Sequence, residues 1–164
     1  MLQTIVGKRG RGKTSLAAEL IASERRDQIF IYDYMAEFRD FQIPGYIEVE
    51  ANTSSFSQFM VDIWERSDEG KSTLVVLDEI AVYGKDNPQI DHLYRLGRHK
   101  GIDVVAISQR FYSLPVIVRS QSDIFHVFQI TELRDQQYLK GLVSEPVLNR
   151  IRTLGMFEYV SLSL

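Results

Sequence analysis

The stretch Gly7-Lys8-Arg9-Gly10-Arg11-Gly12-Lys13-Thr14 decides the fold prediction, because it fits the pattern G-x-x-x-x-G-K-[ST]. An apolar, strand-like segment, Leu2–Val6, comes directly before it, and a helical periodicity begins near Lys13. Glycines let the backbone curl so that successive N–H groups face a bound anion, and the positive end of the following helix adds to this field. A strand, a glycine-rich turn and a helix in this order therefore predict a phosphate-binding loop.

The residue types in this loop predict a nucleotide with a bound magnesium ion. In such loops the lysine reaches the β- and γ-phosphates and the hydroxyl binds Mg²⁺, so we expect these roles for Lys13 and Thr14. The extra charges of Lys8, Arg9 and Arg11 are open to three interpretations: contact with phosphates, contact with a neighbouring subunit, or exposure to solvent. The residues expected to bind the nucleotide are Gly7, Lys8, Arg9, Gly10, Arg11, Gly12, Lys13, Thr14 and Ser15.

A second segment, Ser72–Glu79, is a buried hydrophobic strand that ends in two acidic residues. Ligands of open α/β sheets bind at the carboxyl ends of the strands, so both acids are expected near the phosphate loop. We expect Asp78 to hold the Mg²⁺ shell and Glu79 to polarise an attacking water as the general base. The alternative is an acidic pair that begins an ordinary loop.

The acidic pair also separates classes of nucleotide-binding protein. A switch GTPase favours D-x-x-G at this place and carries an N-K-x-D guanine-binding motif, whereas this chain has Asp78-Glu79-Ile80-Ala81 and lacks N-K-x-D. A small-molecule kinase needs no water-activating glutamate, because its acceptor substrate supplies the nucleophile. Glu79 therefore favours Mg²⁺-dependent hydrolysis of ATP, which is useful where it drives motion.

The alternation of strands and helices along the chain predicts an α/β fold with a mostly parallel central sheet flanked by helices. We expect a RecA-like (ASCE) P-loop NTPase in which one other strand separates the acidic strand from the phosphate-loop strand. Residues 1–164 are expected to form a single domain. The alternating segment Met156–Leu162 is expected at a sheet edge. The other expected strands are Ile29–Tyr32, a short one around Tyr46–Val49, Leu74–Leu77, Val104–Ile107 and Ile124–Phe128.

The composition excludes several classes of protein. With 19 Lys and Arg against 22 Asp and Glu, the net charge of −3 excludes a generally basic coat for nucleic acid. The absence of Cys excludes disulfides, thiolate zinc sites and thiol nucleophiles. His92, His99 and His126 share no ligand spacing. No apolar run approaches the roughly 18–20 residues of a spanning helix, and no charged leader precedes an apolar stretch, so we expect a soluble intracellular protein without a transmembrane segment.

Two further residues are candidates for the reaction. The strand Val104–Ile107 ends in Ser108-Gln109-Arg110, and if it lies between the two site strands, Gln109 points at the γ-phosphate or the attacking water. Upstream, Arg98 lies in a basic cluster that complements the dipole at a helix C-terminus, or that reaches a neighbouring subunit's nucleotide.

The segment Arg98–Arg110 resembles the R-x-x-G segment and the following strand ending in T/S-Q of the FtsK–HerA superfamily of DNA-pumping ATPases. Together with the phosphate loop and the acidic pair, this resemblance extends from Gly7 to about Leu142. The chain looks like the genome-packaging ATPases of tailless icosahedral viruses with an internal membrane. Filamentous-phage assembly ATPases are similar too, but they usually carry a membrane segment.

The resemblance implies a ring-shaped oligomer, commonly a hexamer, that hydrolyses ATP to move double-stranded DNA into a viral capsid. It implies that Arg98 is an arginine finger acting in trans and that Gln109 is a sensor of the γ-phosphate. It also implies a location in the host cytoplasm or at the packaging vertex of the virion, with capsid or membrane proteins as partners. DNA contacts would involve few residues, with Lys85, Arg110 and Arg119 as candidates.

Three alternatives to this function remain. One is an ATPase for plasmid DNA transfer or filamentous-phage assembly, and another is a small P-loop kinase, which the length suits. The third is a scaffold or loader that uses ATP only to oligomerise.

Overall fold

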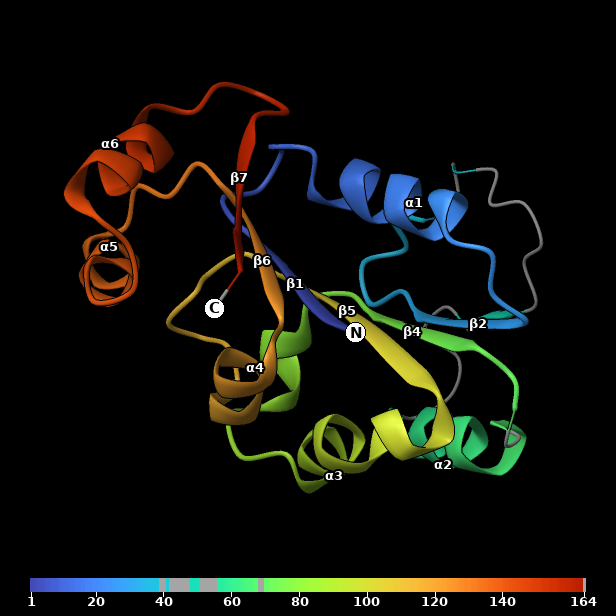
Figure 1. Cartoon of the computed structure of the whole chain (residues 1–164). Helices are drawn as coiled ribbons and strands as arrows, with labels where there is room; N and C mark the ends of the chain where they lie inside the picture. Colours follow the sequence, from blue (N-terminus) through green and yellow to red (C-terminus); the bar gives the residue numbers. More distant parts are fainter. Residues whose placement is uncertain (39–40, 42–47, 51–55, 68–69, 164) are drawn as a thin grey trace.

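The computed structural model describes residues 1–38, 41, 48–50, 56–67 and 70–163. Their central feature is a seven-stranded sheet with the order β3-β2-β4-β5-β1-β6-β7 (Figure 1). Every neighbouring pair from β3 to β6 is parallel, and only β7 pairs antiparallel, with β6. The strands are β1 Leu2–Val6, β2 Gln28–Tyr32, β3 Glu48–Glu50, β4 Thr73–Leu77, β5 Ile102–Ser108, β6 Ile124–Phe128 and β7 Tyr159–Ser163.

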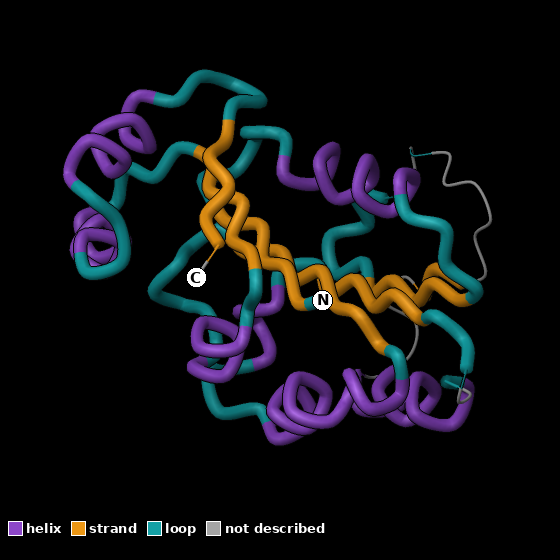
Figure 2. The backbone as a smooth tube through the Cα atoms, in the orientation of Figure 1, coloured by secondary structure: helices purple, strands orange, loops and turns teal. Residues whose placement is uncertain are grey.

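Helices cover both faces of the sheet. The helix α1 (Lys13–Ser23) lies on one face, and α2 (Phe56–Arg66), α3 (Pro88–Leu96) and α4 (Val116–Gln121) lie on the other, while α5 (Leu133–Lys140) and α6 (Glu145–Thr153) flank the end that carries β6 and β7 (Figures 1 and 2). Two 3₁₀ turns, η1 (Ile80–Tyr83) and η2 (Gly97–Lys100), follow β4 and α3. None of the helices in the described ranges is long and apolar enough to cross a membrane.

The central strands are apolar along their whole length because both of their faces are covered. All five residues of β4, Thr73–Leu77, are buried, as expected for a parallel strand between two helical layers. Side chains alternate between the two faces: Leu74 and Val76 pack in the cluster under α1, whereas Val75 and Leu77 pack in the cluster on the opposite face.

The predicted fold class and strand order are confirmed. The strand β5 lies between the phosphate-loop strand β1 and the acidic strand β4, and β7 is an edge strand whose residues alternate between exposed and half-buried. Of the strand expected around Tyr46–Val49, residues 46 and 47 lie outside the described residues, and β3 begins at Glu48. The helix α4 was not predicted, because its six residues are too few to show a period.

The parallel topology gives the sheet two chemically different edges. The carboxyl ends of β1, β2, β4, β5 and β6 meet at one edge, which we call the carboxyl edge, and their starts meet at the opposite, amino edge. Segments that follow strands far apart in the sequence are thereby brought together at the carboxyl edge.

Candidate functional site

The phosphate loop joins β1 to α1 at the carboxyl edge. Its backbone is fixed by the neighbouring strands, since Gly7 N donates to Ser108 O at 3.2 Å and Lys8 N donates to Gln129 O at 3.2 Å. A Cβ atom on Gly7 would lie 2.6 Å from the Phe128 Cβ. Gly12 has a φ of 100°, and a Cβ atom there would lie 2.4 Å from the Phe157 ring. Both positions therefore require glycine.

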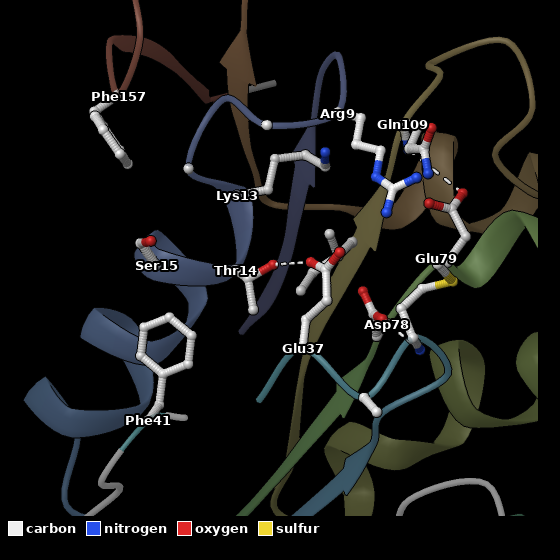
Figure 3. Close-up of a pocket in the computed structure, with 15 residues that line it drawn as sticks. Arg9, Lys13, Thr14, Ser15, Glu37, Phe41, Asp78, Glu79, Gln109 and Phe157 are labelled. Atoms are coloured by element: carbon white, nitrogen blue, oxygen red, sulfur yellow. Dashed lines mark hydrogen bonds between the residues drawn. The ribbon is translucent and has the colours of Figure 1, made fainter. Parts of the chain in front are cut away.

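A cavity of 520 Å³ opens over this loop, a size in the usual range for small-molecule sites. It brings together residues from five separate segments of the chain (Figure 3). Of the predicted site residues, Gly7, Lys8, Arg11 and Arg98 do not line it, and Lys8 lines an adjoining cavity. The lining residues are Arg9, Gly10, Gly12, Lys13, Thr14, Ser15, Met35, Ala36, Glu37, Phe41, Asp78, Glu79, Ile107, Gln109 and Phe157.

Lys13 presents a partly desolvated cation to the cavity. Its residue is only 8% exposed, and its Nζ donates to the Lys8 carbonyl oxygen at 3.2 Å. Burial lowers the pKa of the Lys13 ammonium, and the negative charges of Glu79, Glu37 and Asp78 oppose this shift. A cation held in this way has free donor capacity for an anionic ligand such as a phosphate.

Asp78 directly follows β4 and is buried, with 4% of its surface exposed. Its N donates to Tyr32 O at 3.0 Å, and its Oδ2 accepts from Met35 N at 3.2 Å. Burial raises the pKa of the Asp78 carboxyl to about 6, and the neighbouring acids Asp33, Glu37 and Glu79 add to the increase. The carboxylate therefore lies where a cation would relieve both its burial and its repulsion from the other acids.

Glu79 begins the turn η1 with a left-handed backbone, φ 44°. A non-glycine residue in this region costs about 1 kcal/mol or more, and such strain is concentrated at functional sites. The Glu79 side chain is half-buried and points toward Gln109, whose backbone N lies 3.5 Å from the Glu79 Oε1 (Figure 3). The predicted proximity of the acidic pair, Gln109 and the phosphate loop is therefore present in the structure.

Glu37 is a cavity residue that the sequence analysis missed. The Thr14 Oγ1 donates to the Glu37 Oε2 at 2.7 Å. The turn that carries Glu37 is held by the fully buried Asp33, which accepts from Glu37 N at 2.8 Å and from Phe38 N at 3.1 Å. The acidic residues after β2 could have indicated that Glu37 lies at the site, because β2 ends at the same carboxyl edge as β4.

The cavity residues fit a magnesium ion. Mg²⁺ takes oxygen ligands and is commonly held by one or two carboxylates together with substrate phosphates and water, and the Thr14 hydroxyl and the Asp78 carboxylate line the same cavity. No group of three or more His, Cys, Asp and Glu residues within the described ranges could hold a metal. His126 instead bonds to Gln3 and Ser161. The Thr14 hydroxyl and the Asp78 carboxylate therefore suit a Mg²⁺ ion whose remaining ligands come from a bound nucleotide and water.

Arg98 lies at the amino edge, in the η2 turn before β5, whereas Gln109 follows the end of the same strand. The seven residues of β5 at about 3.3 Å each separate the two by roughly 20 Å. The Arg98 guanidinium lies 3.5 Å from the Asp123 carboxylate, and its side chain is 55% exposed. Arg98 is thus directed away from the cavity of its own chain.

The candidate DNA-binding residues differ in their surroundings. The Lys85 Nζ lies 3.8 Å above the centre of the exposed Tyr112 ring, and Arg110 pairs with Glu132 at 3.3 Å. Arg119 is half-buried against Tyr138, with its Cζ 4.8 Å from the ring centre. Lys85 and Arg110 are therefore more accessible to a polyanion than Arg119.

Phe157 is another cavity residue that the sequence analysis missed. It lies in the turn before β7, is 62% exposed and has a left-handed φ of 63°. Its backbone N donates to the Arg11 carbonyl oxygen at 3.0 Å. No sequence signal indicated this contact, because the turn and the phosphate loop are more than 140 residues apart in the chain.

The fold and the site together define a P-loop NTPase of the RecA-like class: a phosphate loop after β1, an acidic pair after β4, and β5 between these strands. No family model matches the chain. It is similar to the DNA packaging ATPase P9 of Enterobacteria phage PRD1, with 26% identity over 159 residues, covering 85% of this chain and 68% of P9.

Two solved structures have the same fold. One is B204, the DNA-packaging ATPase of Sulfolobus Turreted Icosahedral Virus, with 18% identity and a TM-score of 0.78 over 99% of this chain and 91% of B204. The other is the genome packaging NTPase B204 of Sulfolobus turreted icosahedral virus 2 in complex with ATP-gammaS, with 18% identity, a TM-score of 0.76 and the same coverage. These matches confirm the resemblance to viral packaging ATPases that the motifs indicated.

Proposed function

We propose that this chain is an Mg²⁺-dependent ATPase that drives double-stranded DNA into a viral capsid. The observation that carries this proposal is the convergence of Lys13, Asp78 and Glu79 on one cavity at the carboxyl edge. The similarity to phage PRD1 P9 and to the two B204 structures supports the packaging role. We further propose that residues 1–164 form one ATPase domain, which acts at the packaging vertex of the virion or in the host cytoplasm.

The site residues divide the work of hydrolysis among themselves. The Lys13 ammonium and the loop amides hold the triphosphate. The Thr14 hydroxyl and the Asp78 carboxylate would hold Mg²⁺, which when bound would neutralise charge on the phosphates. Glu79 accepts a hydrogen bond from the attacking water and orients it. The water oxygen bonds to the γ-phosphorus, the bond to the β–γ bridging oxygen breaks, and the released proton passes to Glu79 or to the phosphate formed. Gln109, beside Glu79, senses whether the γ-phosphate is present.

The position of Arg98 supports an oligomer in which each site is completed by its neighbour. Because β5 separates Arg98 from its own cavity by roughly 20 Å, Arg98 reaches a nucleotide only if another subunit presents it. We propose that it acts in trans as an arginine finger in a homo-oligomeric ring, most simply a hexamer. Its 55% exposed side chain is available for this contact.

Lys85 and Arg110 are the residues that we assign to DNA. Both follow strands that end at the carboxyl edge, and Arg110 is adjacent to Gln109, so a DNA contact there is next to the γ-phosphate sensor. The net charge of −3 restricts phosphate contacts to local positions of this kind. Removing either charge weakens DNA binding without regard to base sequence.

The decisive experiment is ATP hydrolysis by the purified protein with and without double-stranded DNA, over a series of protein concentrations. A motor that assembles on DNA gives DNA-stimulated turnover that rises steeply with protein concentration. Rings that form with nucleotide but show no stimulation by DNA would favour a scaffold. Phosphate transfer to a small acceptor in place of water would favour a kinase.

Mixed assemblies test the role of Arg98. Arg98→Ala and Lys13→Ala subunits are each inactive when pure, but a mixture contains interfaces where an intact Arg98 faces an intact Lys13 site. We expect the mixture to regain part of the wild-type hydrolysis. Absence of recovery at every mixing ratio, with assembly verified by light scattering, would rule out action in trans.

A further inference from the structure

We infer that Phe157 is the platform on which the base of the bound nucleotide stacks. This inference rests on the proposed nucleotide site and adds to it the recognition of the base. The phosphate loop, the acidic pair and Gln109 act on the phosphates and do not supply this recognition. It is carried by the position of the Phe157 ring against the phosphate loop, by its exposure and by the way its backbone is held.

The arrangement of the cavity sets the direction in which a nucleotide lies. The γ-phosphate belongs beside Glu79 and Gln109, because the water-activating group must face the phosphorus that is attacked. Figure 3 shows Glu79 and Gln109 on one side of Lys13 and Thr14, and Phe157 on the other. The α-phosphate, the sugar and the base therefore extend past Thr14 and Ser15 toward Phe157.

Phe157 touches the phosphate loop itself. Its ring lies so close to Gly12 that a Cβ atom there would be 2.4 Å from the Phe157 Cδ1, and its backbone N donates to the Arg11 carbonyl oxygen at 3.0 Å. The ring also lines a second cavity of 360 Å³, on the side of α6 and β7. It therefore forms a wall at the end of the nucleotide cavity that is distant from the acidic pair.

The exposure of Phe157 distinguishes it from a packing residue. Its surface is 62% exposed, whereas Phe111, Phe125 and Phe128 are at most 1% exposed. A left-handed backbone at a phenylalanine is strained, yet the hydrogen bond to Arg11 holds it there. A large, exposed aromatic ring kept in a strained position at a ligand cavity suits the flat face of a nucleobase.

The test compares a ligand that has a base with one that has none. Binding of Mg²⁺–ATP and of Mg²⁺–tripolyphosphate is measured by calorimetry for the wild type, Phe157→Ala and Phe157→Trp. Stacking on an aromatic ring is worth about a factor of ten in affinity. We expect Phe157→Ala to bind ATP about tenfold more weakly and tripolyphosphate unchanged, and Phe157→Trp to bind ATP as well as the wild type does.

Two control variants make the result specific. Met156→Ala removes an equally exposed neighbour, also 62% exposed, that does not line the cavity, and it is expected to leave both affinities unchanged. Phe41→Ala removes the other aromatic ring among the described residues that line the cavity. An ATP-specific loss in Phe41→Ala but not in Phe157→Ala would assign the platform to Phe41 and overturn the inference.

The failure of this inference is distinguishable from the failure of the proposed function. Equal losses of ATP and tripolyphosphate affinity in Phe157→Ala would mean that the ring only supports the loop, and the base platform would be rejected while the ATPase stands. Wild-type protein that binds neither ligand would reject the nucleotide site itself. The Phe157→Trp variant guards against misfolding, because it keeps a ring at this position.

Discussion

The two edges of the parallel sheet use charge in opposite ways. At the amino edge, charges neutralise one another: Arg26 pairs with Asp103 and with Glu24, and Asp123 accepts from Leu2 N and faces Arg98. At the carboxyl edge, the charges of Glu37, Asp78 and Glu79 act on Lys13. Burial raises the pKa of the Asp78 carboxyl there, and its acidic neighbours add to the increase. The charges at the amino edge are paired within the chain. The charges at the carboxyl edge suit a bound cation and an anionic ligand.

Backbone geometry shows the same contrast. Three non-glycine residues in the described ranges have a positive φ. Ala36 and Glu79 lie in turns at the carboxyl edge, and Phe157 donates a hydrogen bond from its backbone N to the phosphate loop. At the amino edge, the left-handed position after η2 is taken by glycine, Gly101, which adopts it without strain. Strain is thus confined to the edge that carries the site, where a function offsets its cost.

The largest expected effect comes from Glu79→Gln at the carboxyl edge. Glutamine keeps the size and the backbone position but accepts no proton, so hydrolysis of ATP should fall by about 10²–10⁴-fold. Nucleotide affinity and thermal stability should stay close to those of the wild type. Steady-state phosphate release, together with calorimetric ATP binding, checks this prediction. Turnover within twofold of the wild type would remove Glu79 from the mechanism.

The phosphate loop gives the next largest effect. Gly12→Ala introduces a Cβ atom where φ is 100° and the Phe157 ring is in the way, so ATP affinity should fall about tenfold or more. Gly10→Ala is the matched control, since φ is 72° there but nothing lies within 4 Å of the added atom. The loss of ATP affinity should be larger for Gly12→Ala than for Gly10→Ala. Equal losses would mean that backbone strain, and not the Phe157 ring, sets the requirement.

At the amino edge, Asp103→Asn should change stability and leave catalysis alone. Asp103 and Arg26 are 19% and 18% exposed and lie 2.5 Å apart, so the loss of the charge should lower the free energy of unfolding by about 1 kcal/mol. Urea denaturation measures this change. The kcat for ATP should match that of the wild type at a temperature where both proteins are folded, and a tenfold loss of kcat would break the contrast between the edges.

The smallest effect expected is a pH dependence at the β1–β6–β7 end of the sheet. Burial lowers the pKa of the His126 imidazole, which bonds to Gln3 and Ser161. As the pH falls through about 6.5, the unfolded chain takes up a proton at this residue before the folded chain does, so stability is lost until the pH passes below the folded-state pKa. His126→Gln should therefore lose less stability than the wild type between pH 7.5 and pH 5.

Denaturation midpoints in urea at the two pH values provide the measurement. His126→Gln is expected to be less stable at pH 7.5, so the comparison is between the changes with pH and not between the absolute values. Identical changes in the two proteins would show that His126 is not the group responsible.

Much of the fold and nine of the fifteen described residues that line the cavity could be predicted, because they depend on local patterns. The limits of β1 and β6 matched the apolar runs, and Lys13, Asp78, Glu79 and Gln109 met because each follows or precedes a strand at the same edge. Glu37 and Phe157 were missed because they reach the cavity from turns whose shape depends on distant contacts: a buried Asp33 in one case and the Arg11 carbonyl in the other. The role proposed for Arg98 depends on contact with a second subunit, and this contact is not encoded in the local sequence pattern around Arg98.

The hydrogen bonds from Gly7 to Ser108 and from Lys8 to Gln129 tie the start of the phosphate loop to the ends of β5 and β6, so this part of the loop takes its shape together with the sheet. Because this part of the loop is already ordered by the sheet, a nucleotide that binds there loses little affinity to ordering it. Binding and folding are therefore linked. A substitution that destabilises the pairing of β5, β1 and β6 should also lower the affinity for phosphate, and saturating nucleotide should raise the melting temperature of the protein.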